Sequence, residues 1–271
     1  MVLQHTEKRK MGSIESEPDR WLEYMVEPST LESFFQECSG ILKVRKDKNA
    51  ICSMADSVTE GVDNVWASIE HEQPDYACRK GCSWCCHQNV SVSWPELLQV
   101  LAHLRNEFVT ERLENLGKKC RRKANEVAGK STNQRFDERV ACAFLENGIC
   151  LIHSARPLQC RGGFSEEEKF CRNLCEDREN TQQTIKNGHL RGRYLIAPKL
   201  IYNSAQAAMI YAMKEAGLDA SGYELTVAMA ILLEKLCNGG SDGIGEDDLR
   251  PALLNKQDGD IMTSALGDEV Q

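Results

Sequence analysis

Four cysteines lie within nine consecutive positions of the stretch CRKGCSWCCHQ, residues 78 to 88. Thiolates are nucleophiles and soft metal ligands, so this density predicts a disulfide framework, a redox centre or a metal site. Gly81, directly before the second cysteine, permits backbone conformations that a side chain would exclude. Because adjacent side chains diverge, Cys85 and Cys86 fit a polynuclear cluster, two nearby metals, or one ligand beside a free redox thiol. The four cysteines are Cys78, Cys82, Cys85 and Cys86.

A second group of cysteines follows in CAFLENGICLIHSARPLQC, residues 142 to 160. One predicted helix separates the two groups, and by folding back it would bring them together. Arg156 and Arg161 lie close to the last cysteine of this group. A thiolate-rich centre is negatively charged, so we expect both guanidinium groups to bind the metal group through charge-assisted hydrogen bonds. The predicted ligands from this group are Cys142, Cys150 and Cys160.

Five further residues near these motifs have roles that the sequence leaves open. Trp84, inside the first motif, is expected to shield the site from water. His87 and His153 could each add a nitrogen ligand or act as a structural hydrogen-bonding residue. Cys171 and Cys175 could bind the same centre, form a second site, or pack in the core.

The 271-residue chain contains 13 cysteines, an odd number, and it is long enough to bury a core without disulfides. Its first twenty residues have no apolar segment typical of a signal peptide, and no apolar run is long enough to span a membrane. We therefore expect a cytoplasmic protein with reduced thiols and no membrane contact. In that environment clustered cysteines indicate metal or redox chemistry.

The formal net charge of -8 argues against a nucleic acid partner, because the field of the protein would repel phosphates. One basic run, residues 117 to 130, lacks the interleaved aromatic side chains that stack on bases. We interpret it as the solvated end of a long helix. The expected partners are a metal ion or cluster and a redox or protein partner.

Apolar residues recur every three or four positions over most of the chain, which predicts amphipathic helices. This pattern begins at Trp21 and continues through residues 31–42 and 51–69. No segment shows a convincing strand alternation. The predicted fold class is mainly α: a helical domain around an irregular cysteine-rich metal-binding centre. Four cysteines on or near apolar stripes are expected in the core rather than at the metal: Cys38, Cys52, Cys120 and Cys237.

Capping residues predict where several helices begin and end. Ser93 and Glu96 form an S-x-x-E capping box, which predicts a helix that continues through the basic run with a break at Gly117. The segment 198–217 begins with proline and ends with glycine, which predicts a second helix with a left-handed C-cap. The serine and glutamate at positions 221 and 224 predict another capping box, and a short helix is expected over 248–254.

These patterns divide the chain into five parts. We expect a loose tail over residues 1–18, N-terminal helices over 19–75, and the cysteine-cluster metal-binding core over 76–175. C-terminal helices that pack on this core are expected over 176–255, and an acidic tail over 256–271.

The two cysteine motifs resemble those of the YkgJ-type cysteine-cluster family, which is described as a zinc- or iron-chelating domain. The family pattern is C-x3-C-x2-CC, then a capped helix, then a C-P-F-L…G-x-C-x-I-Y…R-P-x-x-C-R segment. The first part is complete here, and the resemblance covers roughly residues 76 to 165. Matches in the second part are Cys142, Phe144, Leu145, Gly148, Cys150, Arg156, Pro157, Cys160 and Arg161.

The chain departs from this pattern at Ala143, where proline is usual, and at His153, where tyrosine is common. The first change affects the local backbone, and the second could add a nitrogen ligand or alter packing. The resemblance implies a metal or iron–sulfur centre and no single reaction. Some family members resemble flagellin lysine-N-methylases, but no glycine-rich nucleotide fingerprint follows a predicted strand here, so we do not transfer that activity.

The leading hypothesis is therefore a protein that holds an iron–sulfur cluster or iron through cysteines of both motifs, with a redox or electron-transfer role. A zinc-stabilised structural or interaction protein is the alternative from a different class. A metal-dependent protein-lysine methyltransferase-like enzyme and a metal chaperone or sensor remain further alternatives.

Overall fold

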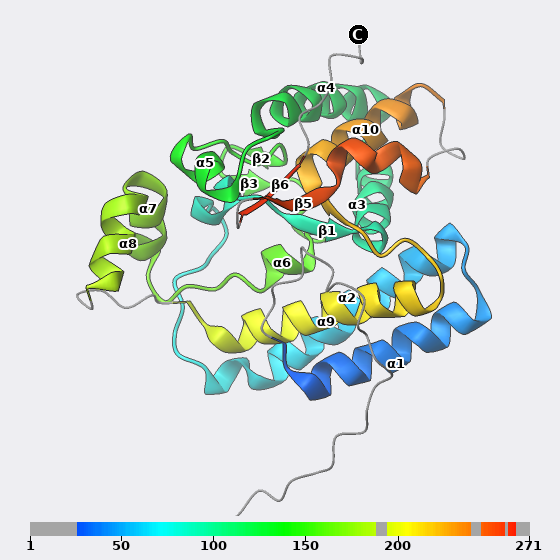
Figure 1. Ribbon diagram of the computed structural model, residues 1–271, viewed down its shortest axis with the longest axis horizontal. Helices are drawn as coiled ribbons and strands as arrows, with labels where there is room; N and C mark the ends of the chain where they lie inside the picture. Colours follow the sequence, from blue (N-terminus) through cyan, green and yellow to red (C-terminus); the bar gives the residue numbers. More distant parts are fainter. Residues whose placement is uncertain (1–25, 188–193, 240–244, 258–259, 264–271) are drawn as a thin grey trace, which may run out of the picture.

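In the computed structural model, which describes residues 26–187, 194–239, 245–257 and 260–263, helices make up most of the regular structure (Figure 1). The strands of this described part form only short two-stranded sheets. The predicted mainly α class is therefore confirmed. The helical pattern expected around Trp21 lies outside the described residues.

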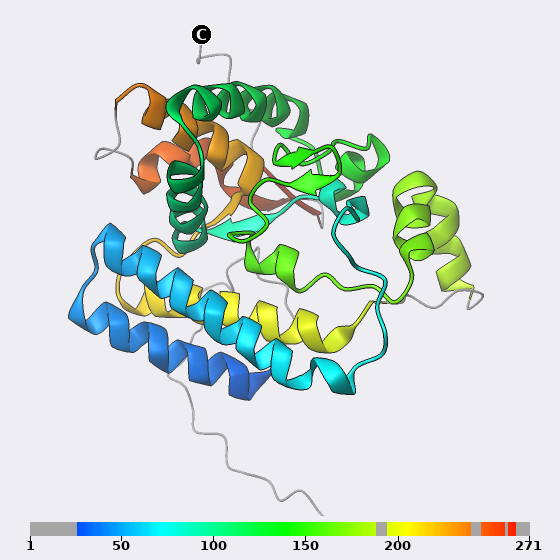
Figure 2. The ribbon, with the colours of Figure 1, turned by 180° about the vertical axis from the view of Figure 1, so that it is seen from behind.

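Three long helices form one layer of the molecule: α1 (Pro28–Val44), α2 (Lys48–Ile69) and α9 (Ile196–Glu215) (Figure 2). The side chains of Glu27 and Asp47 cap α1 and α2, because each accepts hydrogen bonds from free backbone N–H groups of the first turn. Both α1 and α2 pack against α9, which is itself buried along most of its length.

A second layer contains α3 (Trp94–Glu107), α4 (Thr110–Val127) and α10 (Leu225–Cys237). The chain breaks between α3 and α4, not at Gly117 as predicted, and α4 passes through Gly117 without interruption. A Cβ atom at Gly117 would lie 3.4 Å from Cβ of Leu233, so the glycine permits α4 and α10 to approach closely. The basic run lies along α4 and forms ion pairs with glutamates, among them Glu146 and Glu234.

Three short antiparallel strand pairs connect the helices. The strand β1 (Ser91–Ser93) pairs with β4 (Gly222–Glu224), and both strands are buried between the layers. The strand β2 (Leu145–Glu146) pairs with β3 (Ile149–Cys150). The third pair is β5 (Leu254–Gln257) with β6 (Asp260–Thr263), so part of the segment expected as an acidic tail forms a strand.

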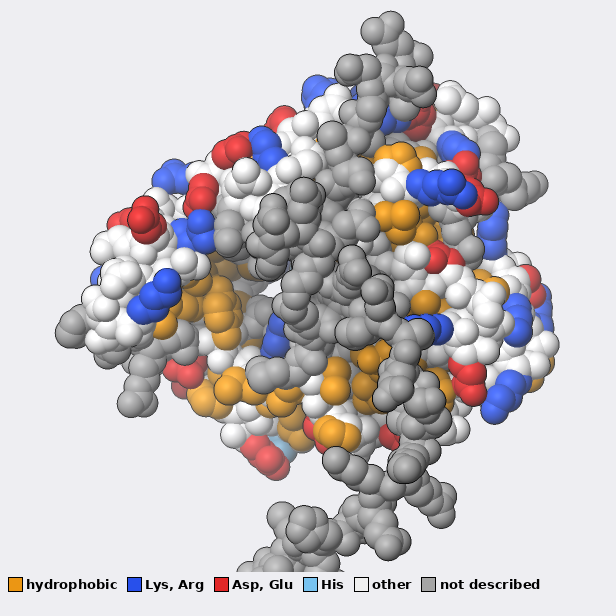
Figure 3. Space-filling model, in the orientation of Figure 1, with side chains coloured by type: hydrophobic (Ala, Val, Ile, Leu, Met, Phe, Trp, Pro, Cys, Tyr) orange, Lys and Arg blue, Asp and Glu red, His pale blue; other side chains and the backbone are white. Residues whose placement is uncertain are grey.

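The remaining elements surround the cysteines. The 3-10 helix η2 (Trp84–His87) lies in the first motif, and α6 (Leu158–Arg161) lies in the second. A lobe of two short helices, α7 (Glu168–Glu176) and α8 (Arg178–Lys186), projects beside them (Figures 1 and 2). Hydrophobic side chains gather where this lobe meets the body of the molecule (Figure 3). The other elements are η1 (Glu70–Glu72), α5 (Thr132–Asp137) and η3 (Glu246–Ala252).

Two other predicted helix boundaries have different outcomes. Gly217 adopts a φ of +71° directly after α9, which confirms the predicted left-handed C-cap. The predicted capping box of Ser221 and Glu224 is wrong, because Ser221 precedes β4 and Glu224 is itself the N-cap of α10. Its carboxylate accepts a hydrogen bond from the N–H of Val227 at 2.8 Å.

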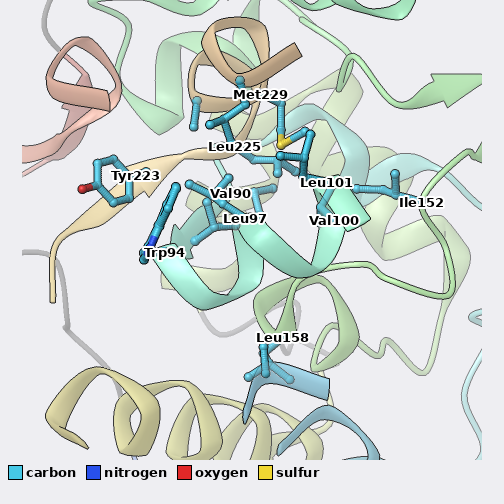
Figure 4. Packing of buried hydrophobic residues seen from close by; sticks show 14 of the residues in the cluster. Val90, Trp94, Leu97, Val100, Leu101, Ile152, Leu158, Tyr223, Leu225 and Met229 are labelled. Carbon is cyan, nitrogen blue, oxygen red and sulfur yellow. The ribbon is translucent and has the colours of Figure 1, made fainter. Parts of the chain in front are cut away.

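The core joins the two layers and extends to both cysteine motifs. Side chains of α3, β4 and α10 meet between the layers, and Ile152 and Leu158 bring the second motif into the same cluster (Figure 4). Cys38 and Cys120 are fully buried in this cluster, which confirms their predicted place in the core. Cys52 and Cys237 are half-buried. Among the described residues, no helix has the length and apolar character to cross a membrane.

The structure confirms the predicted capping box of Ser93 and Glu96. The carboxylate of Glu96 also connects the two layers through hydrogen bonds. Glu96 is 1% exposed and accepts hydrogen bonds from the backbone N–H and hydroxyl of Ser93, at 2.8 and 2.7 Å. The amide of Gln206 in α9 donates to the same oxygen at 2.9 Å. The N–H of Leu158 in α6 donates to the other oxygen at 2.9 Å.

We expect the substitution Glu96→Gln to lower the free energy of unfolding by about 3 kcal/mol, because an amide NH₂ group would replace a carboxylate oxygen that accepts hydrogen bonds from buried donors. The matched control is Glu60→Gln at an exposed position of α2, with an expected change below about 0.5 kcal/mol. Urea denaturation of both variants measures the difference. Equal stabilities would contradict the assigned role of Glu96.

Candidate metal centre

The first cysteine motif is a loop of two tight turns. The N–H of Cys82 donates to the carbonyl of Arg79 at 3.0 Å, and the N–H of Cys86 donates to the carbonyl of Ser83 at 2.9 Å. Gly81 lies in the first turn with a φ of +93°, a conformation that favours glycine. The role predicted for this glycine is therefore confirmed.

The second motif folds as a β-hairpin followed by one helical turn. Cys142 precedes β2, Cys150 ends β3, and Cys160 lies in α6. The hairpin turn is made by Asn147 and Gly148, which both have positive φ and are typical of a tight two-residue hairpin turn.

Backbone contacts hold the two motifs together. The N–H of Cys142 donates to the carbonyl of Cys86 at 2.7 Å. At the hairpin turn, a Cβ atom on Gly148 would lie 3.6 Å from the carbonyl oxygen of Gly81. The motifs are thus in contact at two points, as the sequence predicted from a helix that folds back.

The thiols of both motifs are close enough to influence one another's ionisation. Burial raises the pKa of Cys160 well above its ordinary value, and the thiols of Cys142, Cys85 and Cys150 act in the same direction. Burial raises the pKa of Cys142 to about 11. A hydrogen bond with Cys85, followed by burial, raises the pKa of Cys86.

Cys85 differs from its neighbours. Its side chain is exposed, and a hydrogen bond with Cys86 lowers its pKa to about 7, assisted by the charge of Arg156. The adjacent pair therefore consists of one acidic thiol and one that resists ionisation. The hydrogen bond also keeps the two thiols close to each other, so these neighbouring side chains do not diverge as the sequence analysis expected.

Arg156 faces the thiols with one hydrogen-bond donor unused. Its positive charge acts to lower the pKa values of Cys85, Cys150 and Cys160. Its Nη1 lies 2.9 Å from Nε2 of His153, but its Nε is buried and has no partner among the described residues. A buried donor without an acceptor is costly, and an ionised sulfur nearby would provide one.

Arg161 is placed differently from Arg156. Its Nε donates to the carbonyl of Arg156 at 2.9 Å, and its Nη1 forms an ion pair with Asp63 at 2.7 Å. Its Nη2 donates to the carbonyl of Ser154. Arg161 therefore supports the backbone that positions Arg156.

The two histidines and the tryptophan lie at the edge of the loop. Nδ1 of His87 is 3.2 Å from the carbonyl oxygen of Trp84. Burial lowers the pKa of His153, as does the charge of Arg156, so its imidazole is neutral near pH 7. The indole of Trp84 donates to Glu168 at 3.3 Å and lies under the guanidinium of Arg172, at the junction with α7.

Two cations near the thiols were missed by sequence reasoning. Arg135 is fully buried, with its Nη1 bonded to Glu224 at 2.5 Å and to Asn89 at 3.0 Å, and its charge acts to lower the pKa of Cys142. Burial lowers the pKa of Lys199 in α9, and Cys160 acts in the opposite direction. No local pattern marks either residue, because their positions depend on tertiary packing.

The donor set suits a thiophilic metal, although its geometry is not closed around one. Among the described residues, no group of three or more histidine, cysteine, aspartate or glutamate side chains is arranged to hold a metal ion. Soft thiol ligands and a buried guanidinium donor that lacks an acceptor nevertheless fit iron, zinc or an iron–sulfur cluster. Binding would require the thiols to ionise and move together.

The comparisons with known proteins do not assign a family to this chain. No family model matches the chain, and neither the curated proteins nor the solved structures gave a match. The YkgJ-type resemblance therefore stays a prediction that rests on the quoted residues. The arrangement of the thiols and their cations is the basis for a functional proposal.

Proposed function

We propose that this protein binds iron or an iron–sulfur cluster through the cysteines of both motifs and acts in redox or electron-transfer chemistry. The observation that supports this most directly is the convergence of thiols from two distant segments on Arg156, whose buried Nε has no partner among the described residues. A bound iron centre would supply one-electron redox chemistry.

The raised pKa values of Cys142 and Cys160 favour a site in which these two sulfurs become charged only when a metal binds. Without a cation, burial keeps the thiols of Cys142 and Cys160 protonated at neutral pH. A bound metal ion would replace these protons and offset the cost of burying thiolates. Seven predicted thiol ligands exceed the four of one tetrahedral site, which favours a polynuclear centre or more than one metal.

Metal binding is expected to be coupled to a local rearrangement. Because no three donors surround one point within the described residues, the loop and hairpin must close on the metal. The binding free energy would then stabilise the fold, and chelators would reduce its stability. A zinc-stabilised structural protein shares this property and is the principal alternative.

The methyltransferase alternative has less support. The strands of the described part are short antiparallel pairs, whereas the common dinucleotide-type fingerprint follows a strand of a parallel sheet. We therefore do not propose transfer of a methyl group.

Anaerobic purification followed by metal analysis and visible absorption spectroscopy tests the proposal. We expect iron with visible sulfur-to-iron absorption, and the double variant Cys82→Ser/Cys85→Ser should lose most of the iron because it removes two ligands. The control is Cys237→Ser, since Cys237 is half-buried on α10 in another part of the molecule and should retain full iron content.

A colourless protein with stoichiometric zinc would replace the redox proposal with the structural one. Full iron content in the Cys82/Cys85 double variant would show that the first motif does not hold the metal.

A second prediction concerns the arginine that faces the thiols. The substitution Arg156→Met should weaken metal retention about 10-fold, because supporting hydrogen bonds to metal ligands typically contribute 10- to 100-fold in affinity. Arg156→Lys keeps the charge and should lose less. Competition with a chelator measures the effect, and Arg105→Met, at an exposed position of α3, is the control. Equal metal retention by the Arg156→Met and Arg105→Met variants would show that Arg156 does not support the metal centre.

A further inference from the structure

We propose that a cavity between helices α2 and α3 binds a small organic carboxylate with an apolar body. The cavity has a volume of about 660 Å³, within the range of about 300–1,000 Å³ that is typical of small-molecule sites. None of its lining residues belongs to either cysteine motif. This site is therefore separate from the proposed metal centre and does not depend on a bound metal.

Two helices that pack against each other build the cavity (Figures 1 and 2). The start of α2 contributes Lys48 and Cys52, which lie on the same face because they are four residues apart. The wall from α3 extends from Trp94 to Arg105, which is about 16 Å at the rise of a helix. The lining residues of this wall fall on one face of α3: Trp94, Leu98, Leu101, Ala102 and Arg105.

The α3 wall of the cavity is mostly apolar. Trp94 and Leu101 are buried, whereas Leu98 and Ala102 on the same face are only half-buried. The half-buried pair therefore exposes carbon atoms at the cavity. Removing apolar surface from water is favourable, so an apolar ligand body would bind along this wall.

Cationic side chains line the same cavity. Arg45, Lys48 and Arg105 bring three positive charges, against the single carboxylate of Asp47. That carboxylate is already bonded, because it accepts a hydrogen bond from Nε of Arg45 at 2.8 Å and caps α2. The cavity is therefore positively charged in a chain whose formal net charge is -8, which favours an anionic ligand.

The guanidinium of Arg105 is placed to bind the charged end of such a ligand. It forms no ion pair or hydrogen bond with the described residues, and it is exposed at the far end of the apolar wall. A guanidinium presents paired donors that match the two oxygens of a carboxylate. Arg105 can therefore hold the carboxylate while the ligand body lies on Leu98 and Leu101.

One buried donor in the wall also lacks an acceptor. Trp94 is 3% exposed, and its indole N–H donates to no atom of the described residues. Figure 4 shows the indole nitrogen on the side of the ring that faces away from Leu225 and Met229 in the core. Buried indole N–H groups usually have a partner, and an oxygen atom of the ligand would supply one here.

Isothermal titration calorimetry of the full-length protein tests this site with two probes, one aromatic and one aliphatic: 2-naphthoate and octanoate. We expect each carboxylate to bind saturably, with one molecule per chain. The corresponding alcohols should bind about 5-fold more weakly, because they keep the apolar body and lack the charge.

Two substitutions locate the bound probe. Arg105→Gln removes a charge and should weaken binding of both carboxylates about 5-fold, without affecting the alcohols. Ala102→Trp fills the cavity and should abolish binding of all four compounds. The matched control is Arg122→Gln at an exposed position of α4, which should bind the probes as wild type does.

Alkylation of Cys52 provides a readout in the unaltered protein. Cys52 is half-buried and lines the cavity, whereas Cys237 is half-buried on α10 and does not line it. Bound carboxylate should slow the reaction of Cys52 with iodoacetamide and leave that of Cys237 unchanged. Peptide mass spectrometry measures both rates.

The absence of saturable binding by both carboxylates would overturn this inference, as would equal affinity for the alcohols. Binding that is unchanged in Arg105→Gln, or that leaves Cys52 unprotected, would place the probe elsewhere and would also overturn it. None of these outcomes bears on the metal centre, because the cysteines of both motifs are absent from this cavity.

Discussion

The arrangement of the whole molecule depends on the buried carboxylate of Glu96. It receives donors from Ser93 at the start of α3, from Leu158 in α6 and from Gln206 in α9. Ser93 follows the first cysteine motif and Leu158 precedes Cys160, so this single side chain fixes both motifs relative to the three-helix layer. Each donor buried without an acceptor would cost about 1–3 kcal/mol, which makes alternative packings unfavourable.

A buried ion pair also fixes elements near the cysteines relative to one another. The ion pair of Arg135 with Glu224 joins α5 to β4, and Asn89 connects the pair to the end of the first motif. Glu224 also caps α10, so one carboxylate fixes three elements. Buried ion pairs contribute little net stability but are destabilising when one partner is lost, which makes them suited to fixing positions.

Local chemistry explains what could be predicted from the sequence. The capping box at Ser93 and the glycine cap at Gly217 depend on residues within one or two turns, and both are as expected. The predicted helix break at Gly117 was wrong because this glycine instead permits α4 to approach α10 closely. Helix α10 follows Gly117 by more than a hundred residues, so no local pattern shows this contact. The predicted capping box of Glu224 was wrong because this carboxylate forms an ion pair with Arg135, which is distant in the sequence. The spacing of the cysteines predicted a metal centre. The cations near the thiols, Arg135 and Lys199, could not be predicted, because they come from distant segments.

These cations explain how one site can hold several buried thiols. The raised pKa values of Cys142 and Cys160 keep these buried thiols neutral near pH 7. In the proposed centre a metal would have to displace their protons, so its affinity would increase with pH. The thiolates formed would leave excess negative charge even around divalent ions. Arg156, Arg135 and Lys199 come from three separate segments of the chain, and their charges would offset part of that excess. In the proposed centre, an ionised thiol would give the Nε of Arg156 the acceptor that it lacks among the described residues.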